Sequence, residues 1–272
     1  MPEVNFLYLA ALTRDLDDAG SSDHLSITIN VDGIDVAVAE FVAEHPEAQG
    51  YLQHAVAVVS FDSESLTNSS VRIGNRGDDA WAPQDILLFA VADGGGVIPI
   101  AMETDLTHWL SSDPSEGRLT LPLRLVERGD SSTLIHRLLL LVRTADEDDA
   151  GTDSPVRLQV IGSDGQLRMS ELITNTQTDT PQDDLEQGVS NWYYLPVRTP
   201  FTERDISNPG SVGRIELEIL GRDAWLPESL FLFGLDTPVG RPTKLVPLVS
   251  NRIWQSGVLS QDEKEGSPKI FL

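Results

Sequence analysis

The sequence predicts an all-β protein built from two tandem antiparallel β-sandwiches, and three observations favour this fold class. First, apolar runs of about four to eight residues are separated by clusters of Gly, Pro, Asp and Ser along the chain, a spacing typical of sandwiches rather than of alternating strands and helices. Second, two acidic phrases each occur twice, in the same order. Third, 272 residues are enough for two domains that each bury an adequate core.

The apolar runs give the expected strands in order. In the first copy they are residues 6–12, 25–31, 55–61, 86–91 and 119–126, and in the second copy 134–143, 156–161, 192–197, 214–220, 230–235, 245–249 and 269–272. By periodicity alone, residues 138–141 also fit a helix. Their counterpart Phe6–Leu12 leads into the same acidic loop, so we expect a strand at both places. Asp32-Gly33 and Asp164-Gly165 follow strands at matching positions and are expected to form hairpin turns.

The repeated phrases indicate a duplicated domain. Residues 17–22 (Asp-Asp-Ala-Gly-Ser-Ser) recur as 148–153 (Asp-Asp-Ala-Gly-Thr-Asp), and residues 79–83 (Asp-Ala-Trp-Ala-Pro) recur as 223–227 (Asp-Ala-Trp-Leu-Pro). Matches this far apart indicate copies of a whole domain, because short repeats have shorter periods. The polar stretch Glu127–Thr133 lies between the copies. We therefore expect one domain at 1–129 and the other at 130–272.

The tryptophans also follow the duplication. Trp81 and Trp225 belong to the second repeated phrase, and we expect them to anchor the two cores rather than to bind a ligand. Trp109 and Trp254 each precede a polar turn and a final strand. On this basis we match Trp109 with Trp254 and expect a structural role for both.

Composition restricts the classes of function. With 43 acidic and 19 basic residues the formal charge is −24, so the chain has no basic footprint for nucleic acid and should attract cations or cationic partners. Solubility or a salty environment is the alternative reason for this charge. The absence of Cys excludes disulfides and thiolate sites. No apolar run reaches the roughly 18 residues of a membrane span, and residues 1–4 do not begin a secretory signal. We expect a soluble protein of open compartment, with a lean towards an exported or surface-associated role.

The sequence offers no catalytic constellation. All five His residues lie at or before His136, so the second copy has a single imidazole, close to its start. His-Glu-x-x-His, a Gly-rich phosphate loop with Lys, and Gly-x-Ser-x-Gly are absent. We therefore expect no enzyme activity and no small-molecule substrate. Paired carboxylates for glycoside hydrolysis stay an open alternative, because Asp and Glu are abundant.

These landmarks resemble the PLAT/LH2 family, a C2-like β-sandwich found in lipoxygenases, some lipases, polycystins and the C-terminal part of clostridial α-toxin. The resemblance rests on the opening strand with Asp149–Asp153, the turn at Gly165, the phrase Leu185–Gly188, and Asp223–Trp225 before a late apolar strand. It covers residues 134–272 and, more loosely, 4–126. It implies a β-sandwich that places Ca²⁺ ions between the loops at one end.

In the second copy the resemblance implies up to three Ca²⁺ ions. The first would be held by Asp149, Asp223 and the carbonyls of Gly151 and Ala224, the second by Asp179, Asp184 and the carbonyl of Gln182, and the third by Thr152, Asp153 and Asp183 with Asp184 shared. Carboxylate and carbonyl oxygens, six to eight per ion, are the ligands that Ca²⁺ prefers.

The first copy departs from this ligand set. Asp18, Gly20, Asp79 and Ala80 match the first ion's ligands, but Ser21 and Ser22 replace residues of the third site, and the loop at 46–50 is shorter and lacks the adjacent aspartates. We expect one ion at most in this copy. As an alternative for both copies, Asp and Gly are ordinary turn-forming residues, and the acidic loops could be solvated corners.

The family's module docks proteins onto membranes or onto other proteins. The resemblance therefore implies a non-enzymatic, calcium-binding tandem module that docks onto a protein partner, whose identity stays open, or onto a membrane surface. A structural part of a larger assembly, in which ions only stabilise the fold, is an alternative. Calcium-dependent binding of lipid headgroups is another, and it would be weak because Asp149–Asp153 and Asp179–Asp184 contain no aromatic residue.

Overall fold

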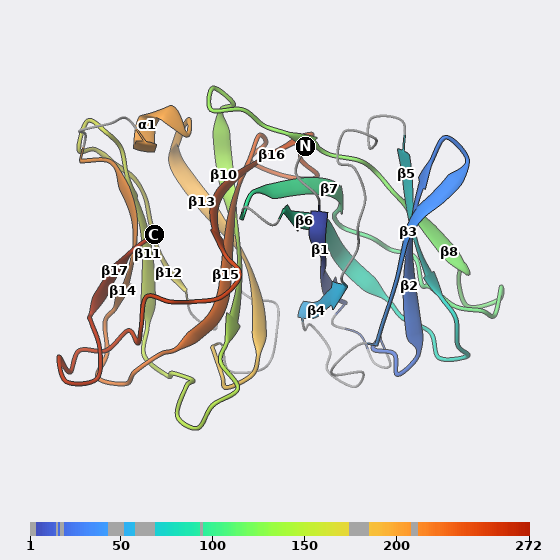
Figure 1. The fold of residues 1–272 in the computed structure, drawn as a ribbon, viewed down its shortest axis with the longest axis horizontal. Helices are drawn as coiled ribbons and strands as arrows, with labels where there is room; N and C mark the ends of the chain where they lie inside the picture. Colours follow the sequence, from blue (N-terminus) through green and yellow to red (C-terminus); the bar gives the residue numbers. More distant parts are fainter. Residues whose placement is uncertain are drawn as a thin grey trace. The chain divides into compact units, whose positions relative to one another are not determined.

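The structure is a computed structural model that describes residues 4–14, 16, 19–42, 52–57, 69–92, 95–173, 185–207 and 212–272 (Figure 1). Strands dominate these ranges, and the one α-helix within them, α1 (Arg204–Ser207), is 4 residues long. No helix in the described ranges has the length and apolarity needed to cross a membrane. The chain divides into two compact units, Met1–Glu127 and Arg128–Leu272.

The first unit is built from two antiparallel sheets. Its strands are β1 (Val4–Thr13), β2 (His24–Val31), β3 (Ile34–Val42), β4 (Leu52–Ala57), β5 (Ser69–Asn75), β6 (Pro83–Ala92), β7 (Val97–Glu103) and β8 (Thr120–Leu123). One sheet has the order β4-β1-β6-β7 and the other the order β3-β2-β5-β8. Leu9 and Leu88 of the first sheet share a buried cluster with Ile27 and Ile73 of the second. The unit is therefore a β-sandwich.

The second unit repeats this arrangement. Its strands are β9 (Glu127–Arg128), which starts at the unit boundary, β10 (Ile135–Thr144), β11 (Val156–Ile161), β12 (Leu167–Ile173), β13 (Ser190–Phe201), β14 (Arg214–Ile219), β15 (Pro227–Leu235), β16 (Lys244–Asn251) and β17 (Lys269–Phe271). The sheet orders are β13-β10-β15-β16-β9 and β12-β11-β14-β17. Apart from β9, each strand therefore has a counterpart at the same place in the first unit.

The predicted fold class, all-β with tandem antiparallel sandwiches, is confirmed. Residues 138–141 lie within β10, so the strand interpretation of this apolar run was right. Asp32 and Gly33 join β2 to β3 with φ angles of 51° and 86°. Two successive positive φ angles are what a type I′ hairpin turn requires. Of the predicted run 55–61, residues 55–57 lie in β4, and residues 58–61 lie outside the described residues.

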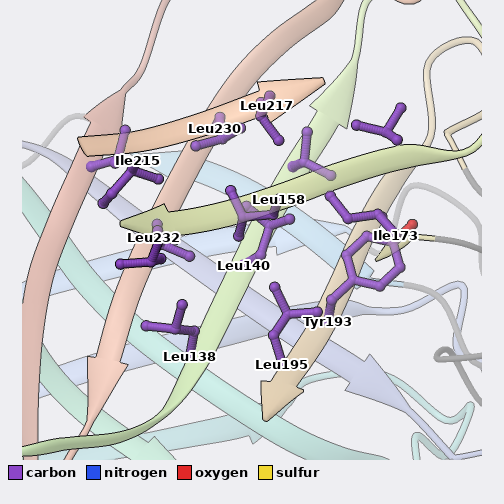
Figure 2. Close-up of a cluster of buried hydrophobic side chains, with 14 of the residues drawn as sticks. Leu138, Leu140, Leu158, Ile173, Tyr193, Leu195, Ile215, Leu217, Leu230 and Leu232 are labelled. Carbon is purple, nitrogen blue, oxygen red and sulfur yellow. The ribbon is translucent and has the colours of Figure 1, made fainter. Parts of the chain in front are cut away.

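The core of the second unit lies between its two sheets, as Figure 2 shows. Leu138 and Leu140 of β10, Leu158 of β11 and Leu217 of β14 are all fully buried there. Along β11, buried and partly exposed residues alternate, which is the period of two expected for a strand with one face in a core. Burying a leucine side chain stabilises by roughly 2 kcal/mol, so a one-residue slip that turned these side chains outward would be costly.

Trp81 and Trp225 are fully buried, as expected for core anchors. The match of Trp109 with Trp254 was wrong. Leu110 forms a bridge with Trp81, and Leu259 forms the same bridge with Trp225. The residue before Leu110 is Trp109, so its counterpart is Val258, the residue before Leu259.

The position of Trp254 is taken by Leu106 in the first unit. The Trp254 amide donates to the Glu228 carbonyl at 2.9 Å, and the Leu106 amide donates to the Gln84 carbonyl at 2.8 Å. Gln84 and Glu228 each follow Pro at the start of the equivalent strands β6 and β15. The two tryptophans are therefore at different positions of the repeat, and residue identity alone suggested the wrong match.

Candidate functional site

The second unit brings two acidic loops together at one end of the sandwich. We call residues 145–154 and 220–226, which carry these loops, the second rim. The Ala145 amide donates to the Leu226 carbonyl at 2.9 Å, and the Leu226 amide donates to the Ala150 carbonyl at 2.9 Å. The Leu220 amide donates to the Pro155 carbonyl at 2.9 Å. These backbone bonds fix the loop after β10 beside the loop after β14.

Asp223 joins the two loops through its carboxylate. The Asp153 amide donates to Asp223 Oδ2 at 3.1 Å, and the Ala224 amide donates to Oδ1 at 3.0 Å. The Asp223 amide in turn donates to Ser154 Oγ at 3.1 Å. A Cβ atom on Gly221 would lie 2.0 Å from this Ser154 oxygen. The close approach of the loops therefore requires glycine at position 221.

The predicted ligands Asp149, Gly151 and Thr152 lie in the first loop of the second rim and differ in exposure and in contacts. Asp149 is exposed and has a φ of 62°, in the left-handed region that non-glycine residues rarely adopt. Thr152 is buried, and its hydroxyl accepts the Ser154 amide at 3.0 Å. A Cβ on Gly151 would lie 2.9 Å from the Gln187 nitrogen, so residues 185–188 pack against this loop.

The structure thus places six predicted ligands on the second rim: Asp149, Gly151, Thr152, Asp153, Asp223 and Ala224. Asp179, Gln182, Asp183 and Asp184, which were predicted to complete the second and third sites, lie outside the described residues.

The charge of the second rim is strongly one-sided. Its carboxylates are Asp146, Glu147, Asp148, Asp149, Asp153 and Asp223, and its single cationic side chain is that of Arg222. Carboxylates held close together repel each other, and a hard cation relieves this repulsion while using their oxygens as ligands. Within the described ranges, no three His, Cys, Asp or Glu side chains are gathered closely enough to hold a metal. Carboxylate and carbonyl oxygens are donors of the kind that Ca²⁺ takes, but the described residues alone do not assemble a metal site.

The first unit has an equivalent rim, which we call the first rim: residues 14–23 and 76–82, of which 15, 17 and 18 lie outside the description. The predicted ligand Asp18 is among these three. The Ala82 amide donates to the Ala19 carbonyl at 2.9 Å, matching the bond between Leu226 and Ala150. The Ser22 amide donates to Asp79 Oδ2 at 2.8 Å. The predicted ligands Gly20, Asp79 and Ala80 lie on this rim.

Two residues of the first rim's surroundings were not predicted. Asn75 Nδ2 donates to the Asp79 carbonyl, and the Asp79 amide donates to Asp23 Oδ2. Neither Asn75 nor Asp23 is repeated in the second unit. Ile219 stands at the position of Asn75, and Ser154 stands at the position of Asp23. A lone Asn at the end of a strand carries no sequence signal for this role.

No family model and no curated protein matches the sequence. Among solved structures, a similarity is found to alpha toxin from Clostridium absonum, with 17% identity and a TM-score of 0.39, covering 53% of this chain and 33% of that chain. Another is found to the paired C2 domains of extended-synaptotagmin 2, with 17% identity and a TM-score of 0.13, covering 82% of this chain and 76% of that chain.

The matched part is about a third of the length of the clostridial toxin. Clostridial α-toxin is one of the proteins named in the resemblance drawn from the sequence, and the β-sandwich expected from that resemblance is present in both units. At 17% identity and TM-scores below 0.5, the similarities say nothing about what this chain binds.

Proposed function

We propose that the second rim binds Ca²⁺ and that the protein is a non-enzymatic docking module, whose ion-ordered rim engages a protein partner. The observation that carries the proposal is the hydrogen bond from the Asp153 amide to Asp223 Oδ2, at 3.1 Å. This bond brings two predicted ligands from loops 70 residues apart to the same place.

Electrostatics supports a cation at this rim. Asp148, Asp149, Asp153 and Asp223 are all exposed, so their carboxylates stay accessible to an ion from solvent. An ion that binds the folded chain and not the unfolded one stabilises it by mass action, by about 2.7 kcal/mol at 100 times the Kd. The expected consequence is a second unit whose stability depends on Ca²⁺.

A protein partner suits the described rim better than a lipid surface. Membrane-docking loops combine charge with apolar side chains that enter the interface. The aromatic residue of the second rim is Trp225, which is fully buried, and Leu220 is 43% exposed. Leu226 is partly buried against the core, so of the leucines on this described rim Leu220 alone stands exposed, and one exposed leucine gives little insertion into lipid. Protein surfaces with Lys and Arg, by contrast, can meet an acidic rim through complementary charge.

Calorimetry with Ca²⁺ and with a chelator tests the ion. For the wild type we expect a melting temperature several degrees higher in Ca²⁺, because about 1 kcal/mol corresponds to roughly 2–4 °C in a chain of this size. Asp149→Asn/Asp223→Asn should lose most of this shift. Glu263→Gln removes an exposed charge of the same unit outside the second rim, and it should keep the shift. A wild type that melts at the same temperature in both conditions overturns the proposal.

Sedimentation with anionic vesicles (phosphatidylserine and phosphatidylcholine) tests the docking surface. We expect no more pelleted protein in millimolar Ca²⁺ than in chelator. Strong calcium-dependent pelleting that Asp149→Asn/Asp223→Asn abolishes would replace the protein partner by a lipid surface, while the ion site would stand.

A further inference from the structure

Asp79 and Asp223 occupy equivalent positions, but different groups donate to them. In the first unit, Ser21 Oγ donates to the Asp79 main-chain oxygen at 3.0 Å, and Asn75 Nδ2 donates to the same oxygen. Ser22 Oγ donates to Asp79 Oδ2 at 3.1 Å, beside the Ser22 amide at 2.8 Å. Three neutral side chains therefore tie the first rim together through one aspartate.

The second unit has other residues at these three positions. Thr152 and Asp153 replace Ser21 and Ser22 in the repeated phrase. Ile219 replaces Asn75: the Ile219 amide donates to the Pro268 carbonyl at 3.0 Å, just as the Asn75 amide donates to the Leu119 carbonyl at 3.1 Å. Each acceptor directly precedes the last strand of its sheet.

None of the replacing side chains donates to Asp223. A carboxylate and an alkyl chain have no donor, and the Thr152 hydroxyl accepts the Ser154 amide instead. In the part of the chain that the structure describes, Asp223 receives hydrogen bonds from the backbone amides of Asp153 and Ala224 alone. The change at position 153 places a carboxylate where the first rim has the Ser22 hydroxyl, while Ser154 in place of Asp23 removes a carboxylate from the group that accepts the aspartate amide.

We infer that the first rim is closed by its own side chains without a cation, so that the response to Ca²⁺ is confined to the second rim. The inference rests on the proposed function for its second half. The physical reason is that hydroxyl and amide donors already stabilise the Asp79 carboxylate and carbonyl. In the second rim the replacing side chains do not donate to Asp223, so a positive ion can stabilise its oxygens instead. The two copies of the duplicated rim are thus held together in different ways. Hydrogen bonds hold the two loops of the first rim together at all times, whereas a bound ion holds the two loops of the second rim together.

Amide hydrogen exchange on the full chain, read by mass spectrometry, tests this division. At Ca²⁺ ten times its Kd, exchange in peptides covering 145–154 and 220–226 should slow by about tenfold relative to chelator. Exchange in peptides covering 19–23 and 76–82 should be the same in both conditions. Slowing of similar size in the first rim overturns the inference. Slowing in neither rim overturns the proposed function, and the next experiment then decides the inference for the first rim.

Substitution of the donors provides that decision. Ser22→Ala removes the hydroxyl bond to Asp79 Oδ2, and it should speed exchange in the first rim several-fold in chelator and in Ca²⁺ alike. Ser112→Ala, at an exposed serine of the same unit, should leave first-rim exchange unchanged. If Ser22→Ala leaves first-rim exchange unchanged as well, the hydroxyl does not close the junction and the inference fails.

The reciprocal exchange of residues is the sharpest form of the test. Asp153→Ser gives the second rim a hydroxyl donor beside Asp223 and removes a charge. In chelator, it should slow second-rim exchange relative to wild type, and the additional slowing by Ca²⁺ should shrink. Faster second-rim exchange in chelator, with the full response to Ca²⁺ retained, contradicts the inference.

Discussion

Trp225 donates its indole N–H to the Thr144 hydroxyl at 3.0 Å, and Trp81 donates to the Thr13 hydroxyl at the same distance. All four residues are at most 1% exposed. Each threonine ends the strand that leads into an acidic loop, and each tryptophan follows the aspartate that joins the loops. The bond therefore fixes the base of each rim from within the core, and it needs no ion to do so.

Thr144→Val should destabilise the second unit. Valine keeps the shape of threonine but leaves the buried Trp225 N–H without an acceptor, which costs about 1–3 kcal/mol. Denaturant unfolding checks the loss. Thr107→Val, at an exposed threonine, is the matched control and should stay within about 0.5 kcal/mol of wild type. Equal stability of Thr144→Val and the control would show that the bond does not hold the rim.

Gly266→Ala should also be costly, because backbone lies where its Cβ would go. That atom would sit 2.1 Å from the Val258 carbonyl oxygen, and a main-chain oxygen cannot move aside without disturbing the Leu259–Trp225 bridge. We expect a loss of about 2 kcal/mol in thermal or denaturant unfolding. Gly96→Ala meets nothing within 4 Å and should be tolerated. A Gly266→Ala variant as stable as Gly96→Ala would contradict the close packing of this turn.

Substitutions of Asp149 can distinguish the effect of backbone strain from that of ion binding. Its φ of 62° favours glycine, whereas its predicted role as a ligand requires the carboxylate. In chelator, Asp149→Gly should be as stable as wild type or more stable by up to about 1 kcal/mol. Asp149→Ala should be less stable than Asp149→Gly, since alanine lacks glycine's freedom. In Ca²⁺ the order should reverse, with wild type above both variants. Melting temperatures in the two conditions check this, and an unchanged order in Ca²⁺ would remove Asp149 from the ligand set.

Much of the fold follows from local pattern. The alternation along β11 specifies a strand whatever its partners, and the turn at Asp32-Gly33 is fixed by its own backbone. The apolar run of β10 is ambiguous by itself, and its strand was predicted from the counterpart at residues 6–12. The repeated phrases also gave the right equivalence of Asp79 with Asp223, because each phrase spans the junction that the duplication preserved. These features depend on residues that are close together in the sequence, and for this reason a single sequence is enough to predict them.

The contacts that distinguish the rims could not be predicted in this way. Ser22 and Asp79 are 57 residues apart, and their hydrogen bond depends on the register of β2 against β5, which no local pattern reports. The wrong match of Trp109 with Trp254 has a related cause. Trp109 directly precedes the bridging Leu110, whereas Trp254 lies five residues before the bridging Leu259, so identical residues occupy unequal positions of the repeat. The predicted ligands at 179–184 lie outside the described residues, and their prediction stands untested.

The environment of Glu216 leads us to expect that the second unit loses stability at acid pH. It is 2% exposed on β14 and pairs with Arg214 at 2.9 Å and Lys269 at 3.1 Å. Burial raises its pKa, but hydrogen bonds from Arg214 and Lys269 and the attraction of their charges outweigh it, so the pKa of Glu216 is lowered. A lowered pKa in the folded state means stability that is present above the unfolded pKa and is lost as the pH falls through the folded one.

Glu216→Gln should therefore cost about 1–2 kcal/mol at pH 7, since hydrogen bonds from charged donors are lost or weakened. The difference between wild type and variant should stay constant from pH 8 to pH 6 and shrink once the pH falls below the ordinary glutamate pKa of about 4.3, because the unfolded chain then takes up the proton before the folded one. Denaturant unfolding across this pH range checks the trend, with Glu263→Gln, at an exposed glutamate, as the control. A difference that grows as the pH falls would show that Glu216 is held in its protonated form, contrary to its two cationic partners.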